Sequence, residues 1–132
     1  MLRHMLDTDI CIRVLRDRPQ SARERFNAEA EGLCISSVTL GELLYGAEKS
    51  ARPVHHRRQV DSFASLLQVL DFDGPAALHF AEIRASLERK GQSIGAYDTM
   101  IAAHARSRGL VVITGNLKEF SRVEGLRSEN WL

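Results

Sequence analysis

The chain has 132 residues, of which 44% are hydrophobic and 27% charged, the balance of one ordinary globular domain rather than of a disordered tail. Its 18 lysines and arginines against 17 aspartates and glutamates leave a formal net charge of +1, which excludes the strongly basic surface that would by itself indicate nucleic-acid binding. No apolar run is long enough to cross a bilayer, the first residues lack a signal-peptide pattern, and Cys11 and Cys34 form neither a disulfide framework nor a zinc-binding spacing. We therefore expect a reduced, cytoplasmic protein with one domain over residues 1–132 and no membrane association.

Apolar runs alternate with helical stripes along the whole chain. In chain order, the pattern first predicts a strand at residues 1–6, helices at 10–16 and 21–31, and a strand at 33–36. A helix carrying Leu40, Leu43, Leu44 and Ala47 follows, then an amphipathic helix beyond Pro53 and a strand at 69–72. The last predicted elements are helices at 75–90 and 96–108, a strand at 110–114, a helical turn at 117–120 and an edge strand ending at Trp131. Strands that alternate with helices form right-handed βαβ units. The sequence therefore predicts an α/β fold in which helices cover both faces of a central, mainly parallel sheet.

Acidic and amide side chains follow the ends of the predicted strands. Asp7 comes directly after the first strand, Glu42 is expected in the first turn of the helix after the second, and Asp98 in the first turn of its own helix. Asn116 and Glu119 follow the strand at 110–114. Because parallel sheets bind ligands beyond the carboxyl ends of their strands, we expect these side chains to lie at one edge of the sheet.

This all-oxygen set indicates a hard divalent cation. Two carboxylates ~4 Å apart repel by about 4 kcal/mol at an effective dielectric near 20, so three of them together need a proton or a cation. Mg²⁺ or Mn²⁺ suits oxygen ligands better than zinc does, and Mg²⁺ needs only one or two direct carboxylates. Asp7 and Asp98 are the candidate ligands, with Glu42 acting through water. A cation held in this way activates water and stabilises a pentavalent phosphate, which predicts metal-assisted hydrolysis of phosphodiesters.

Each acid also has a purely structural interpretation. Asp7 and Asp9 are candidate helix caps, and capping is the stronger interpretation for Asp9 alone. Glu42 fits a capping box that begins at Thr39. Asp98 fits an acid in the first turn of a helix, where the helix dipole stabilises negative charge. Singly, none of these signals is specific, but their joint placement at strand ends favours a functional site.

Several segments carry a resemblance to a known family. They include Leu6-Asp7-Thr8-Asp9, Thr39-Leu40-Gly41-Glu42 within residues 35–47, Gly95-Ala96-Tyr97-Asp98 within residues 94–105, Thr114-Gly115-Asn116 within residues 109–120, and then Gly125, Leu126 and Trp131. In this order and over nearly the whole chain, the sequence strongly resembles the PIN-domain toxins of the VapC type. It looks closest to those carried on enterobacterial virulence plasmids.

The resemblance implies a PIN-like three-layer αβα sandwich and a Mg²⁺- or Mn²⁺-dependent endoribonuclease, the toxin of a type II toxin–antitoxin pair. It implies Asp7 and Asp98 as metal ligands, Glu42 as the acid that completes the set, and Asn116 or Glu119 as the fourth site group. The implied substrate is the initiator tRNA, cut in its anticodon stem-loop. The implied partners are a VapB-type antitoxin that inserts a cationic side chain among the acids, a second copy of the chain in a homodimer, and operator DNA reached only through the antitoxin.

Two positions depart from the family pattern. The family usually has Asn where this chain has Asp9, and close relatives have Thr-Asn-Asn where this chain reads Thr114-Gly115-Asn116. The first change adds a negative charge beside the predicted metal, and the second removes a polar side chain and loosens the loop. Neither touches the three core acids, so we expect activity to survive.

Other features lie outside these motifs. Tyr97 is expected to pack rather than to stack on a base, and the basic run at residues 52–58 is expected to be a solvated helix face. A phosphate-rich substrate needs some local positive charge, and the candidates for this role are Arg84, Arg89 and Lys90.

Two other functions remain as alternatives. Asp7-Thr8-Asp9 after a first strand imitates the Asp-x-Asp nucleophile motif of haloacid-dehalogenase-like phosphatases, but that class also needs a late acidic pair, and Asp98 stands alone before Lys118. The other alternative is a catalytically silent co-repressor or binding module, against which the intact set of acids argues.

Overall fold

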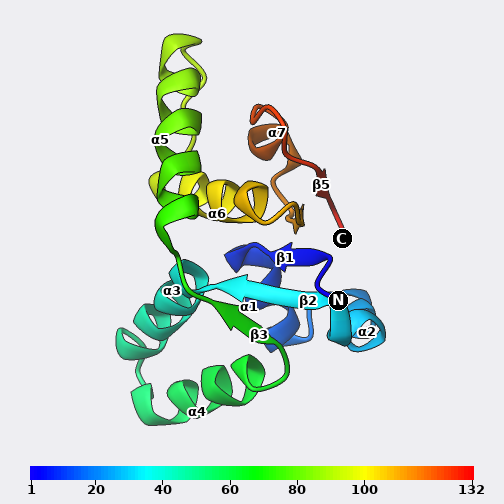
Figure 1. Ribbon diagram of the computed structural model, residues 1–132. Coiled ribbons are helices and arrows are strands. Elements are labelled where there is room, and N and C mark those ends of the chain that lie inside the picture. Colours follow the sequence, from blue (N-terminus) through cyan, green and yellow to red (C-terminus); the bar gives the residue numbers. More distant parts are fainter.

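A five-stranded parallel sheet forms the centre of the molecule in the computed structural model, which describes all 132 residues (Figure 1). The strands are β1 (His4–Leu6), β2 (Leu33–Ser36), β3 (Gln68–Leu70), β4 (Val111–Ile113) and β5 (Ser128–Glu129). They lie in the order β3-β2-β1-β4-β5, and every neighbouring pair is parallel. The first strand is therefore central, and Met5 pairs with Cys34 on one side and with Val112 on the other.

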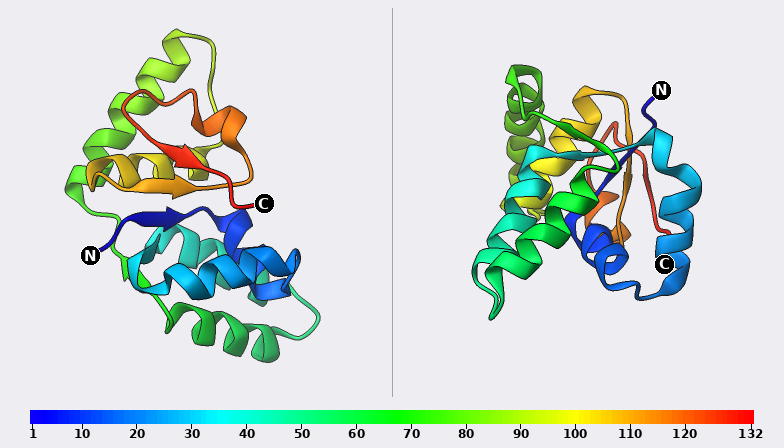
Figure 2. Two further views of the ribbon diagram at one scale, coloured as in Figure 1. Left: turned by 90° about the vertical axis from the view of Figure 1, so that its right-hand side faces the viewer. Right: turned by 90° about the horizontal axis from the view of Figure 1, so that it is seen from below.

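Helices connect the strands and cover both faces of the sheet, as two further views show (Figure 2). They are α1 (Thr8–Arg16), α2 (Gln20–Glu29), α3 (Ser37–Glu48), α4 (Pro53–Ala64), α5 (Gly74–Arg89), α6 (Ala96–Ser107) and α7 (Leu117–Phe120), with a short 3₁₀ turn at Ala30–Gly32. Asp7, Ser36 and Asp73 cap α1, α3 and α5 with their side chains. None of the helices combines the length and apolar composition of a membrane-spanning segment.

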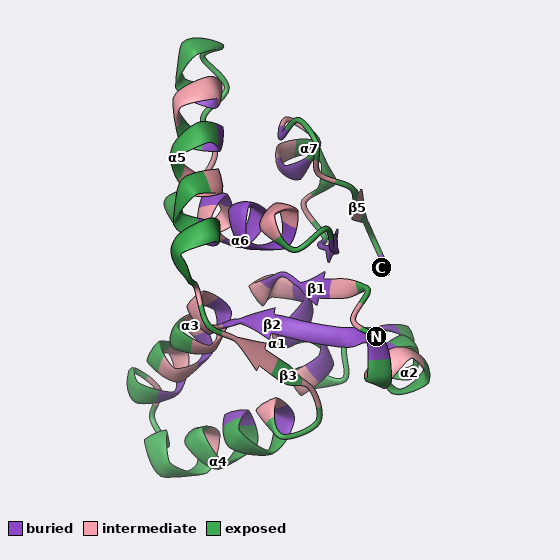
Figure 3. Cartoon of the chain, viewed as in Figure 1, coloured by how far each residue is buried: buried purple, intermediate pink, exposed green.

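The core consists of two hydrophobic layers, one on each face of the sheet. Alternate strand residues feed them, because successive side chains of a strand point to opposite faces. Leu6, Ile35 and Ile113 pack with residues of α1 to α4, whereas Met5, Cys34 and Val112 pack with residues of α5, α6 and α7. Strands β2 and β4 are accordingly buried, whereas the edge strands β3 and β5 are half-buried or exposed, as are the outer helix faces (Figure 3). The predicted three-layer αβα sandwich is confirmed.

The structure corrects the predicted beginning of α3. Residues 37–39 belong to the helix rather than to a preceding turn, because Ser36 ends β2 and its hydroxyl accepts a hydrogen bond from the backbone N–H of Val38. Glu42 consequently lies in the second turn of α3 and not in the first. The buried stripe of this helix runs through Thr39, Leu43 and Ala47, while Leu40 and Leu44 are half-buried.

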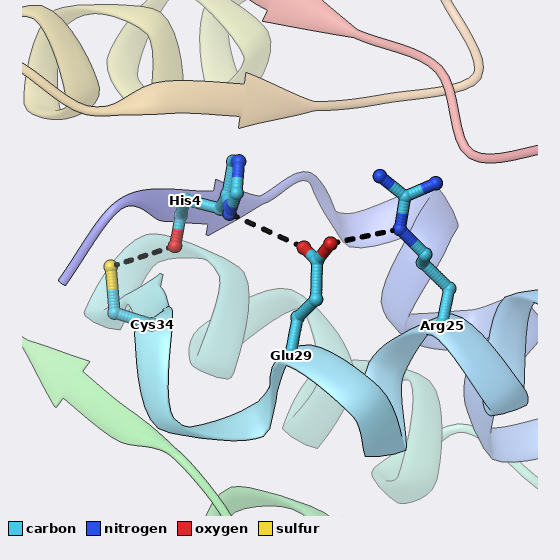
Figure 4. A network of polar contacts seen from close by, with 4 residues as sticks. All are labelled: His4, Arg25, Glu29 and Cys34. Atoms are coloured by element: carbon cyan, nitrogen blue, oxygen red, sulfur yellow. Dashed lines mark hydrogen bonds and ion pairs between the residues drawn. The ribbon is translucent and has the colours of Figure 1, made fainter.

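Polar contacts hold α2 against the start of β1 (Figure 4). The C-terminal segment packs at the same place through Trp131. Glu29 Oε1 accepts a hydrogen bond from Arg25 Nε at 3.0 Å, and its Oε2 lies 3.6 Å from His4 Nδ1. Cys34 Sγ donates to the carbonyl oxygen of His4 at 3.5 Å. The ring of Trp131 packs edge-on against His4 and lies under the Arg25 guanidinium. This network lies at the amino end of β1, away from the acids predicted to form a site.

Candidate active site

Asp7 lies at the carboxyl end of the central strand, where it is 4% exposed and caps α1. Its Oδ1 accepts a hydrogen bond from the backbone N–H of Thr8 at 2.7 Å. Its Oδ2 accepts one from the hydroxyl of Thr114 at 2.8 Å. Thr114 directly follows the neighbouring strand β4, and its Oγ1 also accepts from the backbone N–H of Asn116. The orientation of the Asp7 carboxyl group is therefore fixed by both adjoining loops.

Glu42 is held at the same edge by a hydroxyl of α1. Its Oε1 accepts a hydrogen bond from Thr8 Oγ1 at 2.6 Å, and Thr39 Oγ1 lies 3.2 Å from that hydroxyl. The capping interpretation of Glu42 is wrong, because the cap of α3 is Ser36 and Thr39 lies inside the helix. Glu42 instead links α3 to α1 beside Asp7.

Asp98 lies close enough to other acids for their charges to raise its pKa. It is half-buried in the first turn of α6, as predicted. Burial, followed by the charges of Glu119, Glu42 and Asp9, raises its pKa to about 6. These side chains form what we call the acidic cluster: Asp7, Asp9, Glu42, Asp98 and Glu119.

The pKa of Asp7 is displaced further than that of Asp98. Burial, followed by the charge of Asp9, raises it to about 8, against the opposing hydrogen bond from Thr114. At neutral pH the metal-free chain therefore carries a proton on Asp7. This is how the protein tolerates neighbouring carboxyl groups when no cation is present.

Asp9 is a member of the cluster rather than a helix cap. It lies in the first turn of α1, whose cap is Asp7, and its buried Oδ1 has no hydrogen-bond partner within the chain. A Cβ atom at Gly115 would lie 2.8 Å from Asp9 Oδ2, so the glycine leaves room for this carboxyl group. The two positions that depart from the family pattern therefore meet in space.

The two candidates for a fourth site group are placed differently. Glu119 lies in α7, and its charge acts on Asp98. Asn116 precedes α7, its side chain does not cap that helix, and its backbone N–H is the group that supports Thr114. Electrostatics thus favours Glu119 as the fourth acid, while Asn116 acts through its backbone.

Sequence reasoning missed the threonines of the site. Thr114 directly follows β4, Thr8 follows β1 one residue after Asp7, and each donates its hydroxyl hydrogen to an acid of the cluster. Their position in the sequence could have identified them, because hydroxyl residues that closely follow strands lie at the edge of the sheet where ligands bind.

A groove of about 1120 Å³ opens beside the acidic cluster, with Thr8 and Glu42 in its wall. Its lining comes from α1, α3, α4 and the start of α6 and is largely apolar. Tyr97 lines it and is 60% exposed, so the predicted packing of this ring is wrong. The cations in its wall are Arg16 and Lys49, and His56 also lines it.

The cations predicted to contact RNA lie elsewhere. Arg84 pairs with Glu88 within α5, and Lys90 pairs with Glu124. The last turns of α5 rise away from the sheet (Figure 1). Their charges are therefore directed to neighbouring carboxylates and not to the edge that carries the cluster.

The donor set of the cluster fits a hard divalent cation. Its oxygens are all carboxylates, none of which forms a salt bridge with a lysine, arginine or histidine, although acids elsewhere in the chain do. The unpartnered Asp9 oxygen and the displaced pKa values of Asp7 and Asp98 indicate unneutralised charge. No three acidic, histidine or cysteine side chains are gathered around one ion position.

The chain is similar to known proteins over nearly its whole length. Residues 4–126 match the model of the PIN domain. The chain is 53% identical over 131 residues to the tRNA(fMet)-specific endonuclease VapC of Shigella flexneri, and 54% identical over 131 residues to the protein of that name from Salmonella typhimurium, with 99% of each chain covered in both cases. A chain in the crystal structure of DNA-bound VapBC from Salmonella typhimurium matches with a TM-score of 0.96 and 54% identity, covering 100% of both chains.

Proposed function

Because the chain belongs to the VapC ribonucleases of the PIN-domain family, we propose that it is the toxin of a toxin–antitoxin pair and a Mg²⁺- or Mn²⁺-dependent endoribonuclease. The observation that supports metal dependence best is the acidic cluster itself, which no basic side chain neutralises. Asp7 and Asp98 are the residues that would hold the cation. When bound, it would stabilise the charge of a phosphodiester on its way to cleavage.

The groups around the proposed metal ligands orient the Asp7 carboxyl group, accept a proton or add negative charge. Thr114 Oγ1 and the Thr8 backbone N–H fix the Asp7 carboxyl group, which limits the reorganisation needed when RNA arrives. Glu42 is held by one oxygen only, so its second oxygen is free to accept a proton from an attacking water. Glu119 adds negative charge beside Asp98.

The substrate and the partners are proposed from the relatives. The two endonucleases are named for tRNA(fMet), so we take the initiator tRNA as substrate, cut in the anticodon stem-loop. The similar solved structure is a VapBC complex bound to DNA, so we propose a VapB-type antitoxin, with operator DNA contacted through it and the toxin present as a homodimer. An antitoxin segment with an apolar face suits the groove beside Glu42, and a cationic side chain on that segment would neutralise the acids.

Asp7→Asn and Asp98→Asn test the metal-dependent ribonuclease. Each should reduce cleavage of initiator tRNA more than about a hundredfold, because a carboxylate ligand is lost. EDTA should stop cleavage by the unmodified protein, and Mg²⁺ or Mn²⁺ should restore it. The measurement is the rate of product formation on purified tRNA, with thermal unfolding to check the fold.

Asp7→Asn also has an internal control. Its metal-free unfolding temperature should be no lower than that of the unmodified chain, because asparagine caps helices as well as aspartate and adds no buried charge. If both variants cleave the tRNA at the unmodified rate, the assignment of the site is wrong.

A further inference from the structure

We propose that Tyr45 and Tyr97 form a stacking platform for unpaired RNA bases beside the acidic cluster. The inference rests on the proposed ribonuclease activity and concerns how that site selects its RNA. These two residues are the only tyrosines of the chain. Their exposed fractions are 66% and 60%, so most of each ring is available to a ligand.

Both rings lie on the helices that carry acids of the cluster. Tyr45 follows Glu42 by three residues on α3, which places the two side chains on one helix face. Tyr97 directly precedes Asp98 on α6. Both tyrosines line the groove that contains Thr8 and Glu42. A strand whose phosphate reached the cluster would therefore bring its adjoining bases to the rings.

The charge of the groove suits a nucleic acid. Arg16, Lys49 and His56 line it, and neither Arg16 nor Lys49 forms a salt bridge within the chain. Lys49 Nζ lies 5.1 Å from the centroid of the Tyr45 ring, so one cation accompanies one aromatic face. Aromatic rings combined with unpaired cations are the usual means of binding single-stranded nucleic acid.

Stacking on the platform requires bases that are not paired. Sequence-selective proteins bind RNA mainly at loops and bulges, whose bases can turn outward onto aromatic rings. The platform would therefore direct cleavage to a loop and would reject a continuous duplex. The antitoxin proposed for this groove would contact its apolar lining and the acids, whereas Arg16 and Lys49, which form no salt bridge, favour RNA as the ligand that the platform selects.

The test uses RNA stem-loops with 2-aminopurine in the loop, whose fluorescence falls when the base stacks. Binding is measured in an Asp7→Asn background, which prevents cleavage during the titration. The loop RNA should bind with quenching, and a duplex of the same sequence should not. Tyr45→Leu and Tyr97→Leu should each abolish part of the quenching and weaken binding by about 5- to 150-fold, the range for loss of one stacked base.

Matched variants separate stacking from general surface effects. Tyr97→Phe keeps an aromatic ring and should keep both the quenching and the affinity. Leu78→Ala removes a 61% exposed apolar side chain of α5 that does not line the groove, and it should change neither. In the active background, the leucine variants should lower the rate on the stem-loop RNA.

Three results would overturn the platform. Full quenching and affinity in both leucine variants would show that the rings do not stack on bases. Equal quenching with duplex RNA would contradict the selection of unpaired bases. If the leucine variants bind a VapB-type antitoxin more weakly but retain RNA affinity, the rings serve the protein partner instead. Failure of the unmodified chain to cleave any RNA would instead refute the proposed function.

Discussion

Asp7 combines three tasks that a helix-capping residue alone would not have. It accepts the hydrogen bond that begins α1, it accepts the hydroxyl hydrogen of Thr114, and it lies among four other acids. Both of its oxygens are engaged and the residue is 4% exposed. Membership of the VapC ribonuclease family argues against a phosphatase of the haloacid-dehalogenase type, which also needs a late acidic pair that Asp98 alone does not supply.

Gly115 is predicted to control the position of the Asp9 carboxyl group. In Gly115→Ala, the new Cβ would lie 2.8 Å from Asp9 Oδ2 and 3.0 Å from Leu132 Cδ1, so Asp9 must move. We expect Mn²⁺ to bind about 10- to 100-fold more weakly, the range seen when groups that orient metal ligands are disturbed. Isothermal titration with Mn²⁺ measures the change.

Gly74→Ala is the control for this substitution. Gly74 begins α5, and a Cβ there would meet no atom within 4 Å. Its affinity for Mn²⁺ should equal that of the unmodified chain. Unchanged affinity in Gly115→Ala as well would mean that Asp9 has no influence on the ion.

A hydrogen bond between two elements sets how α3 and α6 lie relative to each other. Ser36 Oγ caps α3 and lies 2.8 Å from Nδ1 of His104 on α6. Burial lowers the pKa of His104, which disfavours a charged ring at this contact, and the Ser36 hydroxyl and the ring nitrogen share one hydrogen bond. The two helices joined here carry Glu42 and Asp98, so the contact also orients the acidic cluster.

Ser36→Ala should destabilise the protein through this contact. The variant loses a helix cap and leaves a buried imidazole nitrogen without a partner, so we expect the free energy of unfolding to fall by about 1–3 kcal/mol. Urea denaturation measures it. Ser62→Ala, at an exposed position of α4, should change it by less than about 0.5 kcal/mol. Equal losses in the two variants would contradict the role assigned to Ser36.

The sequence alone was sufficient to predict the elements whose hydrophobic pattern and boundaries lie in one contiguous stretch of the chain. The apolar run at 33–36 and the helical turn at 117–120 match β2 and α7, because their hydrophobic residues and boundaries are contiguous in the chain. Asp98 was correctly placed in a first turn for the same reason. The sequence left open the alternative of a capping box from Thr39 to Glu42, because a capping box and the interior of a helix share one spacing, and only the contact of Ser36 with Val38 distinguishes them.

Contacts between distant residues could not be predicted in this way. The hydrogen bond between Thr114 and Asp7 joins residues 107 positions apart, and that between Ser36 and His104 joins residues 68 apart. Likewise, Lys49 and Arg16 reach the groove from different helices, whereas the basic residues of α5 had the clearer local pattern. The acids were found because the ends of parallel strands meet at one edge, a rule of topology that needs no pairwise contact.

At the scale of the whole molecule, the small net charge conceals an uneven distribution. The formal charge is +1, yet several acids outside the cluster pair with arginine or lysine, as Glu82, Glu88 and Glu124 do. The cluster has no such partners and lies at one edge of the sheet. The protein therefore concentrates negative potential where a cation would bind and keeps it neutralised in several places elsewhere.

This distribution predicts how stability depends on pH without metal. The folded chain raises the pKa of Asp7 from 3.8 to about 8 and that of Asp98 to about 6, so it holds protons that the unfolded chain releases. The stabilisation that comes from these retained protons is fully present below pH 3.8 and is lost as the pH rises through about 6 and then about 8. In EDTA, the unfolding temperature should therefore fall from pH 5.5 to pH 8.5, and Asp7→Asn should flatten that fall.

Divalent cations should reverse this dependence. On the proposed metal dependence, Mn²⁺ or Mg²⁺ would bind the ionised carboxylates of the folded chain, so its stabilising effect should grow as Asp7 and Asp98 lose their protons. Thermal unfolding at pH 5.5 and pH 8.5, with and without Mn²⁺, should show the larger increase at pH 8.5. Asp7→Asn should reduce that increase at the higher pH. An equal effect of Mn²⁺ at both pH values, or one that the variant leaves unchanged, would place the ion away from these acids.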